Sequence, residues 1–599
     1  ICTHLCQTRC TRNNYDEPVA IRALKRFAAE KGRGAVTAPL QTDYRVAIIG
    51  SGPSGLAAAC FLALNGVQVT IYEAQARAGG MLALAPAFRL PERIVQEDID
   101  RITSLGVKIE LSHPITSPPE ELLTEGFDAV YVAPGFQKGA RLGIAGEDGA
   151  GVFQALDFLA QVARGERVNL GRRVLVIGGG NSAMDAARTA RRLTSGPMTV
   201  VYRRSRREMP ATEEEIEGLF AEGIVLEELA SPTRVILQDG RVAALKCIRN
   251  ELGEAGADGR RKPVAVEGSE FEIEADAIIV AIGQRPDVSF LDGSCVSQRE
   301  NGSIAADPQT GLAGGERVYA GGDAVRGPAT IVEACADGRR AAEAICQQLG
   351  VPFERPAVQL PDPSAEEIVQ VKRVRARKMA QHKAEVLPPE QRGGFDLIEA
   401  TLTEEAALSE AARCMQCSTL CDKCVEVCPN RANYAFVVSP VSLRLPVISC
   451  QQGRLAVTGE EAFSIEQARQ IIHVDDFCNE CGNCATFCVH DGRPYADKPR
   501  LFLTESDFEQ EDDNAFYVER GERGWIIRRR EGGKESYLAL EDGSDEMDFE
   551  NELLRLRLRL RIETMELKEE FEGAFSLVEA AEMAVILKGV ITSLPFLPV

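Results

Sequence analysis

The chain has 599 residues, several times the size of an ordinary domain, so we expect three or more compact units. Its 68 basic and 90 acidic side chains give a formal net charge of −22, which argues against a nucleic-acid-binding surface. The longest apolar runs, such as residues 584–599, contain a lysine and prolines and fall short of the ~20 residues that cross a bilayer, so no membrane span is predicted.

Twelve of the 18 cysteines lie in three clusters. Three are within residues 2–10, five within residues 414–428 and four within residues 478–488. A secreted disulfide framework rarely has this pattern in so large a chain, whereas clustered thiols in an intracellular protein indicate metal. We therefore expect a cytoplasmic protein with metal bound by cysteine. The remaining thiols are expected to be buried small hydrophobes: Cys60, Cys247, Cys295, Cys335, Cys346 and Cys450.

The first predicted nucleotide-binding unit begins at residues 44–74, which read as a strand, a glycine turn, a helix and a second strand ending in an acid. Gly50, Gly52 and Gly55 fit the G-x-G-x-x-G pattern, in which bare backbone approaches a pyrophosphate at a helix N-terminus. Glu73 follows where a carboxylate accepts hydrogen bonds from ribose. The predicted cofactor-binding residues here are Gly50, Gly52, Pro53, Ser54, Gly55 and Glu73, with Gly80 shortly after.

A second unit of the same kind lies in residues 172–210. Its second strand ends in Arg203 and Arg204 instead of an acid, and guanidinium groups suit a 2′-phosphate, so we favour NADPH over NADH. The alternative is that these arginines are solvated or pair with the acids at residues 213–215. The predicted nucleotide-binding residues are Gly178, Gly180, Asn181, Ser182, Arg203 and Arg204.

Further strands end in small turns that let the chain cross near a bound nucleotide. They lie in residues 127–139, 274–287 and 318–342, and the last supplies Asp323 as a partner for a polyol hydroxyl. The candidate cofactor-binding residues in these turns are Gly135, Gly283, Gly322, Asp323 and Thr330. There is no Cys-x-x-Cys pair between Cys10 and Cys414, which argues against thiol exchange.

Two cysteine runs in residues 414–488 indicate two iron-sulfur clusters. Residues 478–488 match the bacterial ferredoxin spacing, whose fourth cysteine binds the other cluster. The run from residue 417 has one extra residue, and Cys414 offers a competing thiol. We assign Cys417, Cys421, Cys424 and Cys488 to one 4Fe-4S cluster, and Cys478, Cys481, Cys484 and Cys428 to the other. Zinc is the alternative for such cysteine pairs.

The order of these motifs, with "GGMLALAPAFRLPERIV" and "VVYRRSRREMPA", resembles the NADPH-oxidising small subunit of glutamate synthase and its relatives. The resemblance implies FAD in the first unit, NADPH in the second, inserted unit, and a Gly322–Asp323 segment that closes on the flavin. It also implies that Cys2, Cys6 and Cys10 are the last ligands of a cluster near the flavin, completed by at least one ligand upstream of residue 1. A terminal disulfide or free thiols remain the alternative.

The combination with "EAARCMQC…CPNRANY" most resembles a group of iron-sulfur flavoprotein subunits named after selenate reductase, over residues 1 to 500. The expected fold class is α/β, with two nested Rossmann-like FAD and NAD(P) domains between an N-terminal helical iron-sulfur fragment and a C-terminal ferredoxin-like module. The predicted boundaries are an N-terminal iron-sulfur tail (1–42), a first FAD-binding segment (43–145), the inserted NAD(P)H domain (146–290), a second FAD-binding segment (291–350), a helical linker (351–410), the two-cluster module (411–500) and an acidic, mixed region (501–599).

We therefore predict an electron-transfer oxidoreductase subunit that moves electrons between NADPH, FAD, 4Fe-4S clusters and a partner protein or subunit. Hydride transfer to flavin needs orientation rather than a side-chain acid, so no catalytic residue is predicted. Two alternatives stay open, which are a flavin-based bifurcating subunit and a non-catalytic wiring subunit of a larger complex. In residues 554–561, alternating Leu and Arg favour a strand.

Overall fold

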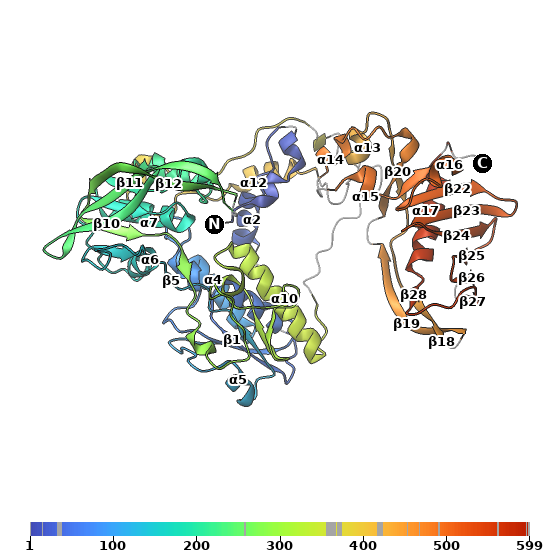
Figure 1. Ribbon diagram of the computed structural model, residues 1–599, viewed down its shortest axis with the longest axis horizontal. Helices are drawn as coiled ribbons and strands as arrows, with labels where there is room; N and C mark the ends of the chain where they lie inside the picture. The colour runs from blue at the N-terminus through green and yellow to red at the C-terminus, as the bar shows by residue number, and fades with distance from the viewer. Residues whose placement is uncertain are drawn as a thin grey trace. The chain divides into compact units, whose positions relative to one another are not determined.

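The computed structural model describes residues 2–14, 16–32, 39–256, 259–354, 367, 370, 374, 375, 377–415, 423–451, 453–465, 468–488, 492–559, 562–594 and 596 (Figure 1). The chain divides into two compact units. The first contains Ile1–His4, Arg22–Val358 and Lys383–Thr403, and the second contains Leu5–Ile21, Gln359–His382 and Glu404–Val599. Among the described residues, no helix combines the length and apolar character needed to cross a membrane.

The first sheet of the first unit has the strand order β15-β16-β4-β1-β2-β3. Its strands are β1 (Arg45–Ile49), β2 (Gln68–Tyr72), β3 (Lys108–Glu110), β4 (Ala129–Val132), β15 (Leu312–Gly314) and β16 (Val318–Ala320), all parallel to their neighbours except β15. Strand β4 pairs with β16 although residues 152–280 build another sheet between them in the chain. The first sheet is therefore completed only after the chain returns from the second.

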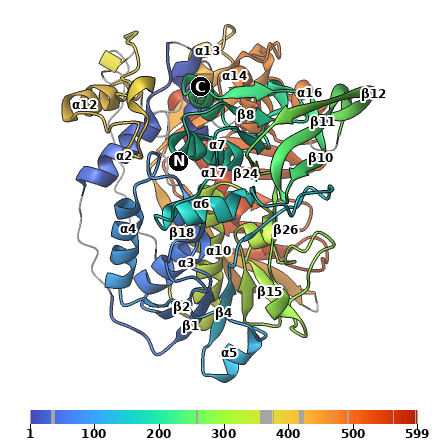
Figure 2. The ribbon, with the colours of Figure 1, turned by 90° about the vertical axis from the view of Figure 1, so that its left-hand side faces the viewer.

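Two helices cover the centre of the first sheet. Helices α3 (Pro53–Leu64) and α10 (Ile331–Leu349) contact each other and lie side by side (Figure 2). A side chain at Gly338 would meet the carbonyl oxygen of Ser54 at 2.1 Å, so glycine permits this close approach. Helix α4 (Glu92–Ser104), the short α5 (Glu120–Thr124) and the single turns η2 (Gly80–Leu84) and α9 (Asp323–Arg326) complete this domain. The buried core includes Val46, Ile48, Leu62, Ile71 and Ile345.

The second sheet is parallel, with the order β6-β13-β7-β8-β9. Its strands are β6 (Val152–Gln154), β7 (Val174–Ile177), β8 (Met198–Val201), β9 (Val225–Glu227) and β13 (Ala277–Val280), and its helices are α6 (Ala155–Ala163), α7 (Asn181–Leu193) and α8 (Glu213–Ala221). The residues of β7 and β13 are buried throughout, as expected for a parallel sheet with both faces covered.

An antiparallel meander of β10 (Ala230–Gln238), β11 (Arg241–Ala255) and β12 (Arg261–Glu274) is inserted before β13. A short ribbon of β5 (Lys138–Gly139) and β14 (Gln284–Arg285) joins the chain segments that enter and leave the second sheet. Helix α2 (Ile21–Lys31) precedes β1.

The second unit is built on a nine-stranded sheet with the order β17-β20-β21-β22-β23-β24-β25-β26-β27. The strands are β17 (Asn433–Val437), β20 (Arg469–Val474), β21 (Arg500–Phe502), β22 (Ala515–Arg520), β23 (Gly524–Glu531), β24 (Lys534–Glu541), β25 (Met547–Glu550), β26 (Leu554–Leu558) and β27 (Ile562–Leu567). One sheet thus continues across residue 500, where the sequence suggested a boundary. Strand β26 confirms the expectation drawn from the alternating Leu-Arg pattern.

Helix α17 (Val578–Ser593) contacts β17, β23 and β24 and buries Met583, Leu587 and Val590. A second sheet has the order β19-β18-β28, from β18 (Val441–Gln451), β19 (Arg454–Ile465) and β28 (Phe575–Ser576). The short helices of this unit are α1 (Leu5–Thr8), α12 (Glu404–Ala412), α13 (Lys423–Val427), α14 (Asn483–Thr486), α15 (Pro494–Asp497) and α16 (Glu505–Phe508).

Candidate functional site

The first glycine turn links β1 to α3 in the geometry that a dinucleotide needs. Gly50 has φ of +102°, and a side chain there would meet the carbonyl oxygen of Ala133 at 2.4 Å. A side chain at Gly55 would meet the carbonyl oxygen of Gly50 at 2.0 Å, so glycine lets the helix pack onto the strand. Gly52, the N-cap of α3, has open space around it and no side chain caps the helix. The helix N-terminus can therefore receive an anionic group.

The acidic residue after β2 is held inside this turn. Glu73 is buried, and its Oε2 accepts hydrogen bonds from the Ser51 backbone N–H at 2.9 Å and the Ser51 hydroxyl at 2.6 Å. Its Oε1 accepts from the Gln75 N–H at 2.8 Å. Oε2 thus already accepts two hydrogen bonds, whereas Oε1 accepts one and retains capacity for a ribose hydroxyl.

Asp323 starts α9 directly after Gly322, beside the same helix α3. Its Oδ1 accepts from the Ala329 N–H at 3.2 Å, and burial raises its pKa to about 6. Asp337 of α10 accepts from the Gly322 N–H at 3.1 Å and fixes this turn. Thr330, also predicted to touch the cofactor, forms a capping box with Glu333 through its hydroxyl at the start of α10.

The raised pKa of Asp323 predicts a pH-dependent stability for the flavin-free protein. The unfolded chain releases this proton near the ordinary value of 3.8, while the folded state holds it up to about pH 6, so wild-type stability falls as pH rises through this window. Because the side chain is partly exposed, Asp323→Asn should gain about 1–2 kcal/mol at pH 7 and less at pH 4.5, measured by denaturant unfolding. An equal gain at both pH values would contradict the assignment.

The second glycine turn links β7 to α7. Gly178 has φ of +145°, and a side chain there would meet the carbonyl oxygen of Ala281 at 2.2 Å. Gly180 is the N-cap of α7, again without a side-chain cap. Asn181 accepts from the Thr212 N–H through Oδ1 at 3.1 Å, and Ser182 is half-buried in the first turn.

The two arginines after β8 differ in their surroundings. Arg203 is exposed, whereas Arg204 is buried and its Nε donates to the carbonyl oxygen of Arg261 at 2.7 Å. Asn250 of β11 donates to the carbonyl oxygen of Arg203 at 2.9 Å. The meander thus holds the loop in place, and Arg203 is the member of the predicted pair whose side chain is open to a ligand.

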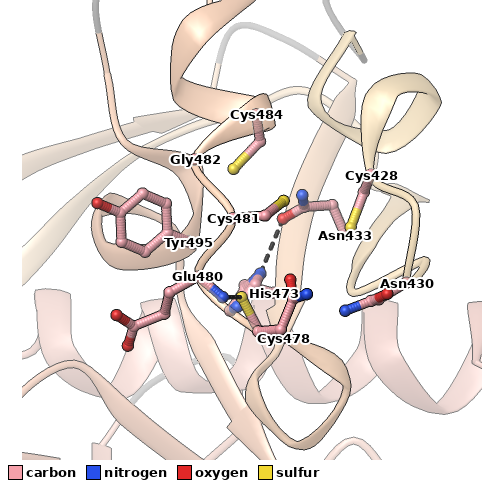
Figure 3. A pocket seen from close by; sticks show the side chains of 11 residues that line it. Cys428, Asn430, Asn433, His473, Cys478, Glu480, Cys481, Gly482, Cys484 and Tyr495 are labelled. Carbon is pink, nitrogen blue, oxygen red and sulfur yellow. Dashed lines mark hydrogen bonds between the residues drawn. The ribbon is translucent and has the colours of Figure 1, made fainter.

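In the second unit, the structure gathers cysteines from the two runs around one pocket. Its lining includes Cys428, Cys478, Cys481 and Cys484, the set predicted for one cluster (Figure 3). Backbone N–H groups donate to Cys428 Sγ from Ala432 at 3.2 Å and to Cys478 Sγ from Glu480 at 3.3 Å. Such bonds stabilise thiolates and tune the clusters they hold.

A buried histidine lines the same pocket. His473 Nδ1 and Asn433 Oδ1 are 2.9 Å apart (Figure 3). Asn433 Nδ2 also donates to the Cys424 carbonyl oxygen at 3.0 Å. Burial lowers the pKa of His473, and its Nε2 has no hydrogen-bond partner in the part of the chain that the structure describes. Asp475 Oδ1 lies 3.9 Å from this nitrogen, beyond hydrogen-bond distance, so a polar group in the pocket fits this site.

The structure describes only some of the other cysteines that are predicted to be cluster ligands. Cys417 and Cys421 lie outside the described residues, Cys424 is buried in α13, and Cys488 Sγ accepts from the Gly492 N–H at 3.3 Å. At the N-terminus, Cys2 belongs to the first unit and Cys6 and Cys10 to the second. Cys2 and Cys10 also accept backbone hydrogen bonds, from His4 and Val19, each at 3.4 Å.

The remaining predicted glycines lie in turns of the first unit. Gly80, Gly135 and Gly283 all have positive φ, and Gly80 lies against Gly52, where an added side chain would come within 2.8 Å of its Cα. Sequence reasoning missed two polar groups near the sites, His473 with Asn433 and Arg89 before α4. Arg89 lies within the quoted stretch "GGMLALAPAFRLPERIV", but nothing local indicates the partners of Arg89 or His473, because these partners are distant in the chain.

Comparison with known proteins gives matches over most of the chain. A family model described as pyridine nucleotide-disulphide oxidoreductase matches residues 44–338. The chain is 36% identical over 534 residues to the oxidoreductase YgfK of Escherichia coli (strain K12), covering 87% of this chain and 46% of YgfK. It thus spans about half the length of this relative.

Two shorter relatives are covered more fully. The beta subunit of the NADPH-Fe(3+) oxidoreductase of Geobacter sulfurreducens (strain DL-1 / KN400) is 37% identical over 463 residues, which is 70% of this chain and 68% of that protein. The glutamate synthase (NADPH) small chain of Escherichia coli (strain K12) is 34% identical over 371 residues, 58% of this chain and 78% of that one.

Proposed function

The chain belongs to the family of pyridine nucleotide oxidoreductases that includes the glutamate synthase small chain and the NADPH-Fe(3+) oxidoreductase beta subunit, and from this we propose an electron-transfer subunit. It moves electrons between NADPH and a partner protein or subunit, with FAD and 4Fe-4S clusters as its cofactors. FAD supplies the exchange between two-electron nicotinamide and one-electron clusters, because it is stable in three oxidation states.

The observation that carries this proposal is the cysteine pocket of the second unit. Cys428 comes from one run and Cys478, Cys481 and Cys484 from the other, as the ferredoxin pattern requires. Within the described residues, no three His, Cys, Asp or Glu side chains converge closely enough to bind one metal ion together. The ferredoxin spacing, with four cysteines in each run and Pro429 after the first, favours a cluster over zinc.

The first unit supplies what the nucleotides require. The uncapped N-terminus of α3 with Gly52 would hold the FAD pyrophosphate, and Glu73 and Asp323 would bind its hydroxyl groups. The N-terminus of α7 and the exposed Arg203 would hold NADPH. Both glycine turns keep their geometry, which supports working nucleotide sites over a subunit that only carries clusters.

Anaerobic titration of the purified protein tests this function. We expect NADPH to bleach the yellow flavin absorbance and to produce cluster EPR signals, and NADH to do so much less efficiently. Protein that lacks flavin absorbance, or that contains zinc in the thiol sites, would overturn the proposal. Reduction of a low-potential ferredoxin only in the presence of a second acceptor would identify a bifurcating subunit instead.

Arg203 is expected to determine the choice of nucleotide. Arg203→Ala should raise the KM for NADPH by about 10- to 100-fold, since a charge-assisted hydrogen bond to phosphate is lost, and leave NADH oxidation unchanged. Arg167→Ala, an exposed arginine on the α6–β7 loop, is the control. Equal losses for both nucleotides would remove the basis for this assignment. We leave Arg204 intact because it is buried against the Arg261 carbonyl group.

A further inference from the structure

One arginine links the two nucleotide-binding domains of the first unit. Arg89 lies between η2 and α4, in the predicted FAD domain, and contacts two helices beside the second sheet. Its Nη1 is 2.5 Å from Asp185 Oδ1 on α7, and its Nη2 is 2.9 Å from Glu215 Oε1 on α8. The three side chains are 17%, 16% and 13% exposed, so these ion pairs are shielded from solvent.

The carboxylate partners of Arg89 are held by other side chains of their own domain. Glu215 Oε2 also accepts from Arg188 at 2.6 Å, and Arg188 and Arg192 both donate to Glu222. The guanidinium of Arg192 lies 3.8 Å from the ring centre of Phe88, the neighbour of Arg89. Three arginines therefore face three carboxylates, and Arg89 enters a site whose carboxylates are already held in place.

Both ends of this link lead directly to the glycine turns. The Arg89 segment begins at Gly79, whose N–H contacts the Ser51 hydroxyl oxygen at 3.1 Å in the first turn. Asp185 lies one helical turn after Asn181, the first residue of α7, which follows the second glycine turn. The segment from Gly79 to Arg89 and the Arg89–Asp185 ion pair thus connect the predicted flavin-binding turn to α7, the predicted nicotinamide-nucleotide-binding helix.

Apolar packing between the two domains is incomplete around this link. A cavity of about 680 Å³ is lined by Val95 and Ile99 of α4 on one side, and by Leu159, Val162 and Thr189 on the other. The Thr189 hydroxyl has no hydrogen-bond partner in the described region of the chain. Arg89 is therefore one of the links that can fix the relative orientation of the two domains.

Other contacts also join the two domains, among them the packing of η2 on α6. Arg77 donates to the Ala163 carbonyl oxygen at 3.1 Å, and Leu84 packs against the second core. Neither residue pairs with charged side chains on two separate helices, as Arg89 does.

We propose that Arg89 is a positioning residue that fixes the NAD(P)H domain against the FAD domain in the orientation required for hydride transfer. The inference rests on the proposed function. It deepens that function because hydride transfer needs the reacting atoms about 3–3.5 Å apart, and a misplacement of about 1 Å costs about 100-fold in rate. A residue that sets this distance acts on the rate of transfer rather than on nucleotide affinity.

The test separates transfer from binding. With Arg89→Met, the rate of flavin bleaching at saturating NADPH in anaerobic stopped flow should fall by about 100-fold, while flavin content and the Kd for NADP⁺ stay within about threefold of wild type. Arg89→Lys keeps the charge but cannot bridge both carboxylates, so it should recover some of the rate. Arg173→Met is the control, because Arg173 pairs with Asp276 and Glu274 inside one domain.

A second measurement does not depend on hydride transfer. Spin labels on non-natural residues at the exposed positions Glu125 and Arg167 report the distance between the two domains. We expect one narrow distance distribution for the wild type and for Arg173→Met, and a broad one for Arg89→Met. An unchanged rate or an unchanged distribution in Arg89→Met would overturn the inference. A wild type that NADPH does not bleach would overturn the proposed function, and the label distances would still decide the role of Arg89.

Discussion

Cys484→Ser is expected to remove one of the two C-terminal clusters and to lower the iron content by about four atoms per chain. The Cys484 side chain is 7% exposed and lines the cysteine pocket, and a serine hydroxyl does not ionise to replace the thiolate there. Delivery of electrons from NADPH to an external one-electron acceptor should fall by at least tenfold, while flavin bleaching by NADPH remains. Iron analysis, EPR and acceptor assays on the same preparation measure these effects.

A matched control exists in the same unit. Cys450 lies half-buried on β18 and belongs to neither predicted ligand set, so Cys450→Ser should keep the full iron content. Full iron and unchanged EPR in Cys484→Ser would refute the ligand assignment. Iron loss in Cys450→Ser would show that the measurement reports general damage.

In the predicted ligand assignment, the last cysteine of each run binds the cluster of the other run, and this allows a sharper test. If Cys428 and Cys478 hold the same cluster, each serine variant loses that cluster and the double variant loses no more than either one. If each run instead holds its own cluster, the double variant loses about twice as much iron as a single variant. The shared pocket predicts the first result.

The glycine turns show how much of the site could be predicted from local pattern. Gly50, Gly55 and Gly178 occupy positions where a side chain would meet backbone oxygen within 2.4 Å, so the motif carries its own steric reason. The ferredoxin spacing is equally local, and it led to the four cysteines that the structure gathers in one pocket. Their roles in binding stay predictions.

What the sequence did not reveal depends on long-range contacts. Arg204 is buried and donates a hydrogen bond to the carbonyl oxygen of Arg261, a residue of the meander that lies 57 residues further along the chain. The pairing of Arg89 with α7 and α8 depends on how two sheets are placed, which no periodicity encodes. The nine-stranded sheet was also missed, because its edge strand β17 lies next to a cysteine run that reads as a separate small module.

Another long-range feature joins the N-terminal cysteine segment to the second cysteine region within the second unit. Arg12, two residues after Cys10, donates to the carbonyl oxygens of Arg413 at 3.0 Å and Arg375 at 2.8 Å. Arg413 in turn donates to the Glu17 carbonyl oxygen at 2.7 Å and to Glu410 Oε1 at 2.6 Å. Both arginines are 1% exposed, so the segment is held by fully desolvated charges.

Two carboxylates take part in this network: Asp16 pairs with Arg12 and Arg413, and Glu410 pairs with Arg413. We choose Glu410 for the test. It is 0% exposed, and besides Arg413 it accepts from the Ala20 N–H at 2.7 Å and the His382 N–H at 2.8 Å. Removing it deprives the buried Arg413 guanidinium of its nearest carboxylate and leaves two backbone donors unpaired, which costs about 3–5 kcal/mol. Glu410→Ala should therefore loosen residues 5–21, and their amides should exchange hydrogen about 100- to 5,000-fold faster than in the wild type.

Hydrogen exchange followed by mass spectrometry measures this opening locally, which suits a chain of several cooperative units. Glu405→Ala, an exposed glutamate on the same helix α12, is the control and should leave exchange in residues 5–21 unchanged. Because Cys10 and Cys414 flank the network, Glu410→Ala should also slow reduction of the C-terminal clusters if electrons pass through the N-terminal one. Wild-type exchange in Glu410→Ala would show that the segment is anchored by other contacts.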